Sequence, residues 1–389
     1  MADNKVLLEA RDLKVHFFTD EGVVKAVDGL DLVVQSGKTL CLVGESGCGK
    51  SVASRAFLGI VQPPGRIVSG EVLFHPDGAV RTAVRTGVGT GAGTDGETID
   101  IARMDPKGTE IRQIRGREIS MIFQEPMTSL SPMYTVGNQI MENILLHTPD
   151  SKDVARQRTI ELLDQVGIPK PDRLVDEYPF RLSGGMRQRA MIAMALSCNP
   201  TMLIADEPTT ALDVTTQAQI IDLMLGLQRE YGMAVLFITH DLGVVAEVAD
   251  DVAVMYLGRV VERAPVDTVF NDPKHPYTQS LLRSIPKIAM RREELDPIKG
   301  MVPNPFRRPE GCTFNPRCPK VMEVCRHVVP SVTQLDAMHT VRCLLYEPDV
   351  GHRPSEPVGT GRSEPDDIAG RQNGSAETHL GRQNGIGRN

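Results

Sequence analysis

The chain has 389 residues, of which 41% are hydrophobic, and this is enough for one large domain, a smaller one and a substantial core. The formal net charge is −7 and the pI is about 5.8, which argues against a nucleic-acid partner, because nucleic-acid-binding proteins usually carry a basic face. No apolar run approaches the ~18 residues that a membrane span needs, and the N-terminus shows no apolar signal region, so we expect a cytoplasmic protein.

The N-terminal part of the chain predicts two strands and then a buried strand that leads into a glycine-rich loop. The first two strands are expected at residues 7–17 and 23–34, the buried strand at 38–43, and a helix at about 50–60. The loop fits the pattern G-x-x-x-x-G-K-[ST] in full and reads Gly44-Glu45-Ser46-Gly47-Cys48-Gly49-Lys50-Ser51. The order of strand, loop and helix is the context that a phosphate-binding loop requires.

The chemistry of this loop suits a nucleoside triphosphate such as ATP. Backbone N–H groups between Gly44 and Lys50 would surround the β- and γ-phosphates, because glycines let the backbone approach closely. Lys50 would place a positive charge against the γ-phosphate, and the Ser51 hydroxyl would bind Mg²⁺. The alternative is a chance glycine-rich turn, and the flanking strand and helix argue against it.

Two segments are expected to lack a packed structure. Residues 76–100 are rich in Gly, Thr, Ala and Val, with six glycines up to position 96, and we expect a flexible insertion at about 77–99. Residues 349–389 are rich in Gly, Arg, Asn, Ser and Pro, which predicts a disordered tail.

The middle of the chain alternates strands and helices, which predicts an α/β fold with a mostly parallel sheet. Strands are expected at residues 118–123, 202–206 and 234–239, and helices at 153–166 and 186–197. The carboxyl ends of parallel strands meet at one edge of the sheet, where ligands bind in such folds. Polar residues follow all three strands at this edge, namely Gln124, the pair Asp206 and Glu207, and His240.

The adjacent acids complete a site for phosphate chemistry. Asp206 would lie beside the metal ion, and Glu207 would polarise a water molecule in line with the γ-phosphate. Two acids at the end of an apolar run are also compatible with a solvated turn. The phosphate loop in the same chain favours the catalytic interpretation.

A further motif, at residues 182–189, reads Leu-Ser-Gly-Gly-Met-Arg-Gln-Arg and resembles the signature of ATP-binding cassette (ABC) proteins. The order of phosphate loop, Gln124, signature, paired acids and His240 resembles the ABC ATPase family over about residues 5–265. This resemblance implies an ABC-type nucleotide-binding domain: a RecA-like core with a mostly parallel sheet, an N-terminal antiparallel β subdomain, and an α-helical subdomain at about 128–198.

The resemblance also implies a role for each motif. Gln124 would sense the γ-phosphate and, with Ser51 and Asp206, the Mg²⁺ ion, and His240 would be the switch histidine. An aromatic side chain would stack on adenine; Phe17 and Phe18 are the candidates, and a core phenylalanine is the alternative. The residues expected to contact the ATP held by a second cassette, or to lie at the seam between the two, are Ser183, Gly184, Gly185 and Asp213.

A narrower resemblance, to the ATPases of oligopeptide and dipeptide importers, is visible at residues 122–132, 178–181, 275–278 and 311–319, and extends to about residue 347. It implies an energy-coupling subunit that pairs with an identical or paralogous ATPase subunit, two transmembrane permease subunits and an extracytoplasmic substrate-binding protein. Such a subunit would lie at the cytoplasmic face of the inner (plasma) membrane. The substrates of this subfamily include peptides, nickel, opines and sugars. The implied domains are an ATPase domain at 1–265 and a small Cys-rich C-terminal domain at 266–348.

Four cysteines lie close together in the C-terminal region with the spacing C-x5-C-x6-C-x17-C, namely Cys312, Cys318, Cys325 and Cys343. The spacing lacks the paired C-x-x-C of common zinc sites, and four thiolates suit a [4Fe-4S] cluster or zinc. Related importer ATPases carry an iron–sulfur cluster on matching cysteines, so the resemblance favours a cluster here. Zinc, with His339 or His327 as a further ligand, and unligated thiols are the alternatives.

Two other functions are compatible with a phosphate loop. One is a soluble ABC ATPase of DNA repair or translation, some of which also carry metal clusters, and the other is a phosphate-loop kinase. The chain has a single cassette, no long heptad insertion and an acidic charge balance, which argues against repair or translation. The signature motif and His240 argue against a kinase.

Overall fold

The computed structural model describes residues 5–76, 98–124, 129–210, 212–284 and 298–348. The chain divides into two units, Met1–His352 and Arg353–Asn389, and every described residue belongs to the first. The predicted tail at 349–389 lies outside the described residues, as does the predicted insertion at about 77–99 except for its last two positions.

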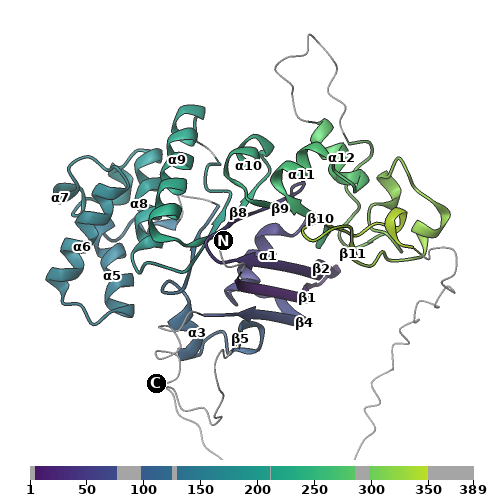
Figure 1. The fold of residues 1–389 in the computed structure, drawn as a ribbon. Coiled ribbons are helices and arrows are strands. Elements are labelled where there is room, and N and C mark those ends of the chain that lie inside the picture. Colours follow the sequence, from purple (N-terminus) through teal and green to yellow (C-terminus); the bar gives the residue numbers. More distant parts are fainter. Residues whose placement is uncertain (1–4, 77–97, 125–128, 211, 285–297, 349–389) are drawn as a thin grey trace, which may run out of the picture. The chain divides into compact units, whose positions relative to one another are not determined.

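The N-terminal strands form an antiparallel sheet with the order β2-β1-β4-β5 (Figure 1). Its members are β1 (Val6–Thr19), β2 (Gly22–Gln35), β4 (Gly65–Phe74) and the short β5 (Ile99–Asp100). Side chains such as Leu13, Val15, Val27 and Leu30 are fully buried on its inner face. Both predicted N-terminal strands are confirmed and run a few residues longer than expected.

The central sheet has eight strands in the order β11-β12-β10-β9-β3-β8-β7-β6. The strands from β9 to β6 pair in parallel, and β10, β12 and β11 continue the sheet in antiparallel pairs. The mostly parallel α/β sheet that the sequence predicts is therefore confirmed. The strands are β3 (Thr39–Val43), β6 (Ile119–Ile122), β7 (Met202–Asp206), β8 (Ala234–Thr239), β9 (Asp251–Tyr256), β10 (Arg259–Pro265), β11 (Thr333–Gln334) and β12 (Thr340–Val341).

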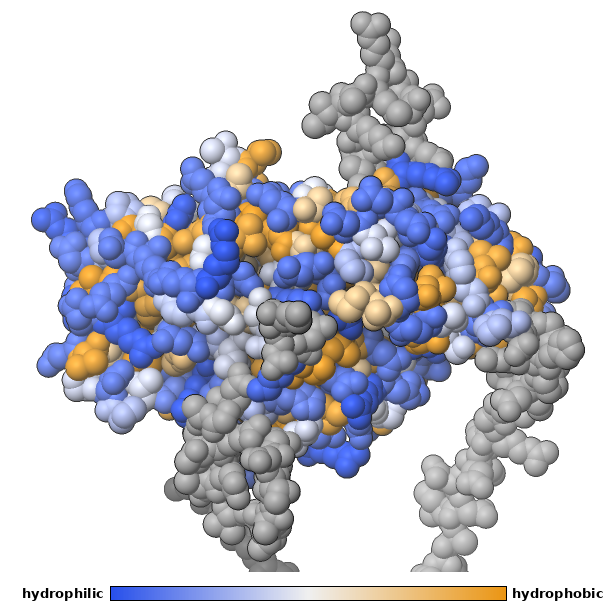
Figure 2. Space-filling view, viewed as in Figure 1, coloured by the Kyte–Doolittle hydropathy of each residue, from blue (hydrophilic) through white to orange (hydrophobic). Residues whose placement is uncertain are grey.

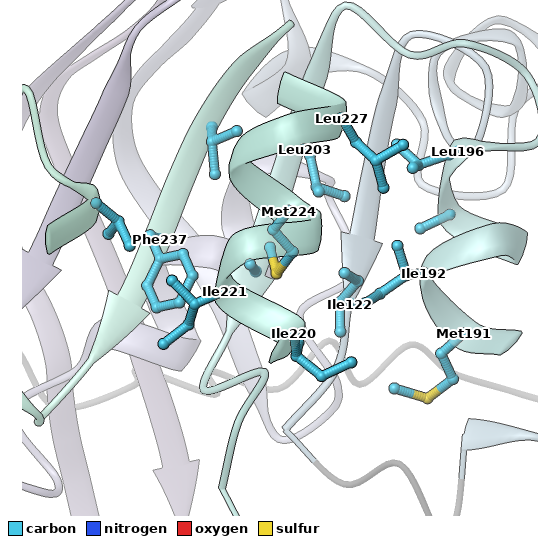
Figure 3. Close-up of a cluster of buried hydrophobic side chains, with 14 of the residues drawn as sticks. Ile122, Met191, Ile192, Leu196, Leu203, Ile220, Ile221, Met224, Leu227 and Phe237 are labelled. Carbon is cyan, nitrogen blue, oxygen red and sulfur yellow. The ribbon is translucent and has the colours of Figure 1, made fainter. Parts of the chain in front are cut away.

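The strands of the parallel part are buried on both faces, because each face has its own hydrophobic core. In β7, Leu203 and Ala205 belong to the core shared with α8 (Gly184–Leu196) and α9 (Val214–Tyr231), and Met202 and Ile204 belong to the core shared with α1 (Lys50–Phe57) and β1. Successive side chains of a strand point to opposite faces, so alternate residues enter different cores. Figure 3 shows part of the first core, where side chains of α9 gather with Phe237 of β8 and with side chains of α8.

The helices fall into three groups along the chain. Four helices, α5 to α8, follow one another between β6 and β7 and lie together at the left of Figure 1. Of the others, α1 and α3 contribute to the core that includes β1, and α9 to α12 contribute to the core that includes α8. Their bounds are α1 (Lys50–Phe57), α3 (Thr109–Ile114), α5 (Val136–His147), α6 (Lys152–Gln165), α7 (Pro171–Leu174), α8 (Gly184–Leu196), α9 (Val214–Tyr231), α10 (Leu242–Val248), α11 (Val266–Asn271) and α12 (Pro276–Arg283). Short 3-10 helices lie at Ile101–Arg103, Pro179–Arg181, Asn315–Arg317, Glu323–Arg326 and Leu344–Tyr346.

The C-terminal region packs into the same compact unit as the rest of the described chain. Strand β12 pairs with β10 through Glu262 with Val341 and Arg263 with Thr340, so this region extends the central sheet. A separate Cys-rich C-terminal domain is therefore not shown. No helix among the described residues is long and apolar enough to cross a membrane. Figure 2 shows hydrophilic side chains over most of one face, with hydrophobic ones interspersed.

Candidate functional site: a nucleotide site at the edge of the central sheet

The phosphate loop connects the end of β3 to the start of α1 and passes close to neighbouring backbone. Gly44 and Gly49 have positive φ angles of 153° and 106°. A Cβ atom at Gly44 would overlap the carbonyl oxygen of Met255, and one at Gly49 would overlap that of Ala26. Glycine is therefore required at both positions, for backbone conformation and for space.

Lys50, at the first position of α1, is buried and turns back over the loop. Its Nζ donates to the carbonyl oxygen of Gly44 at 2.7 Å and to that of Glu45 at 3.2 Å. The ammonium group is thereby held against the loop, where the sequence predicts the γ-phosphate.

Ser51 and Asp206 form a second pair of polar groups beside the loop. The Ser51 hydroxyl donates to the Asp206 carboxylate at 3.0 Å, although 155 positions separate the two residues. Burial raises the pKa of Asp206, and the Ser51 hydroxyl acts against that rise. A hydroxyl and a carboxylate in this arrangement are oxygen donors of the kind that Mg²⁺ prefers. These residues therefore fit the expected magnesium site.

Glu207 follows β7 with its backbone in the left-handed region, at a φ of 48°. Its N–H donates to the carbonyl oxygen of Ile238 at 2.9 Å, and this bond to β8 holds the unusual conformation. Such a conformation costs about 1–3 kcal/mol in a residue other than glycine, and it is typical of functional sites.

Three side chains converge on the Glu207 carboxylate. The Gln124 amide donates to Oε2 at 3.0 Å, the Thr210 hydroxyl donates to the same oxygen at 3.1 Å, and His240 Nδ1 lies 3.3 Å from Oε1. The structure thus brings Gln124, Glu207 and His240 together at the carboxyl edge of the sheet. Thr210 was missed by sequence reasoning, although its position three residues after Glu207 in a tight turn was a signal that could have revealed it.

The signature residues begin α8 and lie on the surface. Ser183 is the N-cap, and its hydroxyl accepts a hydrogen bond from the N–H of Met186 at 3.3 Å. Ser183 and Gly184 are exposed, whereas Leu182 before them is buried. A Cβ at Gly184 would meet no atom within 4 Å. The N-terminus of this 13-residue helix is therefore open toward solvent.

Asp213 caps the next long helix. Its carboxylate accepts from the N–H of Thr216 at 3.0 Å and from the hydroxyl of the same residue at 2.7 Å, so it is the N-cap of α9. The hydrogen bond from the Thr216 hydroxyl is the main reason that the pKa of Asp213 is lowered. The structure thus gives Asp213 a structural role beside the role expected at a dimer seam.

The two candidate aromatic residues differ in their surroundings. Phe17 is half-buried, packs on the core and lies against Gly65. Phe18 is 40% exposed, and the Arg66 guanidinium lies 4.2 Å from its ring centroid. Both alternatives from the sequence, an adenine-stacking ring and a core ring, remain compatible with Phe17.

The predicted iron–sulfur cluster is wrong. No group of three or more His, Cys, Asp or Glu side chains in the described part of the chain could hold a metal ion, and Cys312, Cys318, Cys325 and Cys343 are all free thiols. Burial raises the pKa of Cys312 to about 11 and that of Cys343 to about 12, so both thiols are protonated at neutral pH. Cys312 and Cys318 instead pack against the hydrophobic core.

The zinc alternative is contradicted by the same finding. His339 Nε2 lies 2.8 Å from a carboxylate oxygen of the fully buried Glu262, and His327 lies 3.5 Å from Glu323. Neither histidine is part of a metal-binding group. Closeness of cysteines in the sequence was a misleading signal here, because no three of these side chains are arranged so that they could hold a metal ion.

Fold and site together define an ATP-binding cassette. A family model described as ABC transporter matches residues 27–210, and one described as oligopeptide/dipeptide transporter, C-terminal region, matches residues 261–325. The chain belongs to the ABC transporter family, in the group of its ATP-binding proteins.

Among ABC ATP-binding proteins, the chain is similar to those named for oligopeptide and dipeptide transport. The oligopeptide transport ATP-binding protein AppD of Bacillus subtilis is 49% identical over 341 residues, which cover 88% of this chain and 97% of that protein. The dipeptide transport ATP-binding protein DppD of Escherichia coli is 46% identical over 345 residues, covering 89% of this chain and 98% of the relative.

Solved structures support the same class. The dimeric structure of the ATP-binding cassette MJ0796 in a post-hydrolysis state, bound to ADP and Pi, matches with a TM-score of 0.54 at 25% identity, covering 67% of this chain and 99% of that chain. The ABC transporter component cbiO1 of Clostridium perfringens matches with a TM-score of 0.53 at 26% identity, over 69% and 92% of the two chains.

Proposed function

We propose that this chain is the ATP-hydrolysing, energy-coupling subunit of a binding-protein-dependent ABC importer of peptides. The observation that carries the proposal is the Glu207 carboxylate, held by Gln124 and His240 beside the Ser51–Asp206 pair. The names of the relatives, which are oligopeptide and dipeptide transport proteins, support peptides as the substrate. The same names support a role in transport over the alternative of a repair or translation factor.

Each residue of the site has a distinct task in ATP hydrolysis. The phosphate loop and Lys50 bind the β- and γ-phosphates, and Ser51, Asp206 and Gln124 would hold Mg²⁺, which neutralises phosphate charge when bound. Glu207 accepts a proton from the attacking water molecule, because its carboxylate lies at the end of β7 next to the metal-binding pair. Gln124, Thr210 and His240 orient this carboxylate through the contacts described above.

A second ATPase subunit, identical or paralogous, would complete the site. Ser183 to Gly185 lie at the N-terminus of α8, and a helix N-terminus favours an anion. Ser183 and Gly184 are exposed to solvent, so a ligand held by another subunit could reach them. The dimeric cassette MJ0796 bound to ADP and Pi supports such pairing by similarity of fold. Asp213 would then lie at the seam between the two subunits.

The remaining partners follow from the importer class. Two transmembrane permease subunits would receive the movement of the cassettes, and an extracytoplasmic binding protein would deliver the peptide. The helical region offers exposed hydrophobic side chains for the permease contact, among them Met133, Tyr134, Leu146 and Phe180. We accordingly place the chain as a peripheral subunit at the cytoplasmic face of the inner membrane. We assign hydrolysis to residues 1–265, with the helical subdomain at about 128–198, and partner or loop contacts to 266–348.

Transport in cells tests this proposal directly. A strain that lacks this gene should fail to accumulate a radiolabelled dipeptide or a short oligopeptide, and the wild-type chain on a plasmid should restore uptake. The Glu207→Gln variant should be produced at the same level without restoring uptake. Normal peptide uptake in the deletion strain, or its restoration by Glu207→Gln, would contradict the proposed function.

A further inference from the structure

The C-terminal region contacts the phosphate loop through two side chains that converge on one residue of the loop. The Arg317 guanidinium forms a double hydrogen bond with the Glu45 carboxylate, at 2.6 Å to Oε2 and 3.0 Å to Oε1. The hydroxyl of Tyr277 accepts a hydrogen bond from the Glu45 backbone N–H at 2.9 Å. The second residue of the phosphate loop is thus held at its backbone and at its side chain, in each case by a residue after position 265.

Arg317 is itself held firmly. Its side chain is only 3% exposed, and its Nε and Nη2 atoms donate to the carbonyl oxygens of Lys299 and Ile298 at 3.2 and 3.5 Å. The hydrogen bond to Glu45 is the first cause of the raised pKa of Arg317, so the guanidinium stays charged. A fixed, two-point contact of this kind defines the direction of the Glu45 side chain more closely than a single charge would.

Tyr277 lies in a buried aromatic cluster at the start of α12. Its ring centroid is 4.6 Å from that of Tyr256, and Phe314 stands edge-on to both rings at 5.4 and 5.2 Å. Tyr256 is the last residue of β9, and Phe314 immediately precedes the short helix that ends at Arg317. The two contacts with Glu45 therefore belong to one packed unit.

A series of buried hydrogen bonds holds the start of α12, and with it the aromatic cluster. The Glu262 carboxylate accepts from the backbone N–H groups of Lys274 and His275, at 2.6 and 2.9 Å, and lies 2.8 Å from His339 Nε2. His275 Nδ1 accepts from the Tyr277 N–H at 3.0 Å, and burial lowers the pKa of His275 to about 3, which keeps this nitrogen an acceptor. The series links His339, directly before β12, to the backbone of Tyr277, whose hydroxyl contacts the phosphate loop.

We propose that Arg317 and Tyr277 are positioning residues of the ATP site, through which the C-terminal region sets the shape and the charge of the phosphate loop. The inference rests on the proposed binding of ATP at this loop. Without Arg317, the Glu45 carboxylate would carry an unpaired negative charge on the loop that binds a triphosphate, and the two anions would repel each other. Without the Tyr277 hydroxyl, the Glu45 N–H would lose a buried partner and the loop would loosen.

The proposal explains why the C-terminal region and the cassette occur together in one chain. Both contact residues lie within residues 261–325, the part that matches the oligopeptide/dipeptide transporter C-terminal model, and Glu45 lies within the ABC model. Because the contact couples ATP binding to docking of this region, the coupling acts in both directions. ATP should therefore protect the C-terminal region from proteolysis in the wild-type chain and protect it less in the Arg317 variant.

The test measures the affinity of the full chain for Mg-ATP with a fluorescent ATP analogue. Arg317→Met should weaken binding roughly tenfold, which corresponds to ~1.4 kcal/mol, and Tyr277→Phe should weaken it about threefold. Arg342→Met is the matched control, since Arg342 also joins the C-terminal region to an acidic residue of the cassette, Asp31, at 2.6 Å, but away from the phosphate loop. The control should lower the melting temperature and leave the affinity unchanged.

A rescue experiment distinguishes the effect of the unpaired Glu45 charge on ATP affinity from a general loss of stability. The double variant Arg317→Met with Glu45→Gln should bind ATP more tightly than Arg317→Met alone, because no unpaired carboxylate remains. Should Arg317→Met fail to fold, Tyr277→Phe still decides the question. Wild-type affinity in Arg317→Met and Tyr277→Phe, or an equal loss in Arg342→Met, would overturn the inference. Failure of the wild-type chain to bind ATP would instead overturn the proposed function, and Lys50→Ala provides the reference for lost binding.

Discussion

The Gln124 amide donates a hydrogen bond to the Glu207 carboxylate at 3.0 Å, across 83 positions of the sequence. The contact is possible because β6 and β7 pair in parallel, so that the residues following Ile122 and Asp206 emerge at the same edge of the sheet. His240 reaches the same carboxylate from the end of β8, the next strand. Three neighbouring strands thus deliver the groups that surround the proposed general base.

Glu207→Gln should slow ATP hydrolysis by ~10²–10⁴-fold, the usual contribution of a general base, while ATP binding is retained. The amide preserves the shape of the side chain but cannot accept a proton from water. Phosphate release and retention of labelled ATP by the purified complex measure the two effects. Glu247→Gln, an exposed acid on α10, is the control and should hydrolyse ATP at the wild-type rate. Wild-type turnover in Glu207→Gln would remove this residue from its role.

Lys50→Ala should abolish hydrolysis and weaken ATP binding, because the γ-phosphate loses its main protein cation. The variant also removes the hydrogen bonds from Nζ to the carbonyl oxygens of Gly44 and Glu45, so the loop itself should become less ordered. Nucleotide titration and phosphate release report the two losses. Lys152→Ala, at the exposed start of α6, should behave like the wild-type chain.

Ser183→Arg should reduce hydrolysis while leaving the nucleotide affinity of the chain that carries it nearly unchanged. The reason is geometric, since Ser183 lies at an open helix N-terminus that would serve the site of the partner cassette. Ser151→Arg is a matched control, because Ser151 caps α6 in the same way, through the N–H of Val154 at 3.3 Å. Each substitution should cost about 1 kcal/mol of stability from the lost cap. Loss of ATP affinity in Ser183→Arg itself would argue against the two-cassette arrangement.

The buried thiol of Cys343 should make the folded chain less stable at alkaline pH. Burial raises its pKa in the folded state from the ordinary 9.0 to about 12. Above pH 9 the unfolded chain therefore loses this proton while the folded chain keeps it, so stability is fully present below about pH 9 and falls as the pH rises toward about 12. Melting temperatures recorded from pH 8 upward, about half a unit apart, should fall more steeply for the wild-type chain than for Cys343→Ala. Equal slopes would contradict the expected titration.

Chelators should leave the melting temperature of the chain unchanged when ATP is absent, since no metal-binding group is found among the described residues. The measurement is thermal unfolding with and without a strong chelator, after anaerobic purification. Iron analysis on the same sample is the control. A brown, iron-containing protein that loses stability with the chelator would contradict this expectation.

The nucleotide chemistry could be predicted from the sequence because it depends on short, local patterns. The loop from Gly44 to Ser51 requires its glycines for backbone conformation, and the acids Asp206 and Glu207 stand at the end of an apolar run that is typical of a buried strand. Strand ends marked by Gln124 and His240 could be assigned to the same edge because parallel strands share a direction. In each of these patterns, the physical cause of the predicted structure lies in residues that are neighbours in the sequence.

Contacts between distant segments were decided by the tertiary structure alone. The pairing of Glu45 with Arg317 joins residues 272 positions apart, and no local pattern at either one indicates the other. The same holds for Tyr277, whose hydroxyl meets the Glu45 N–H only because α12 packs beside the phosphate loop. The cysteines show the opposite case: their closeness in the sequence suggested a metal centre, whereas burial raises the pKa of Cys312 and Cys343, and Cys312 and Cys318 pack against the core. The sequence thus determines which reactive side chains are present. The packing of the chain decides which of these side chains meet and in which protonation state they are held.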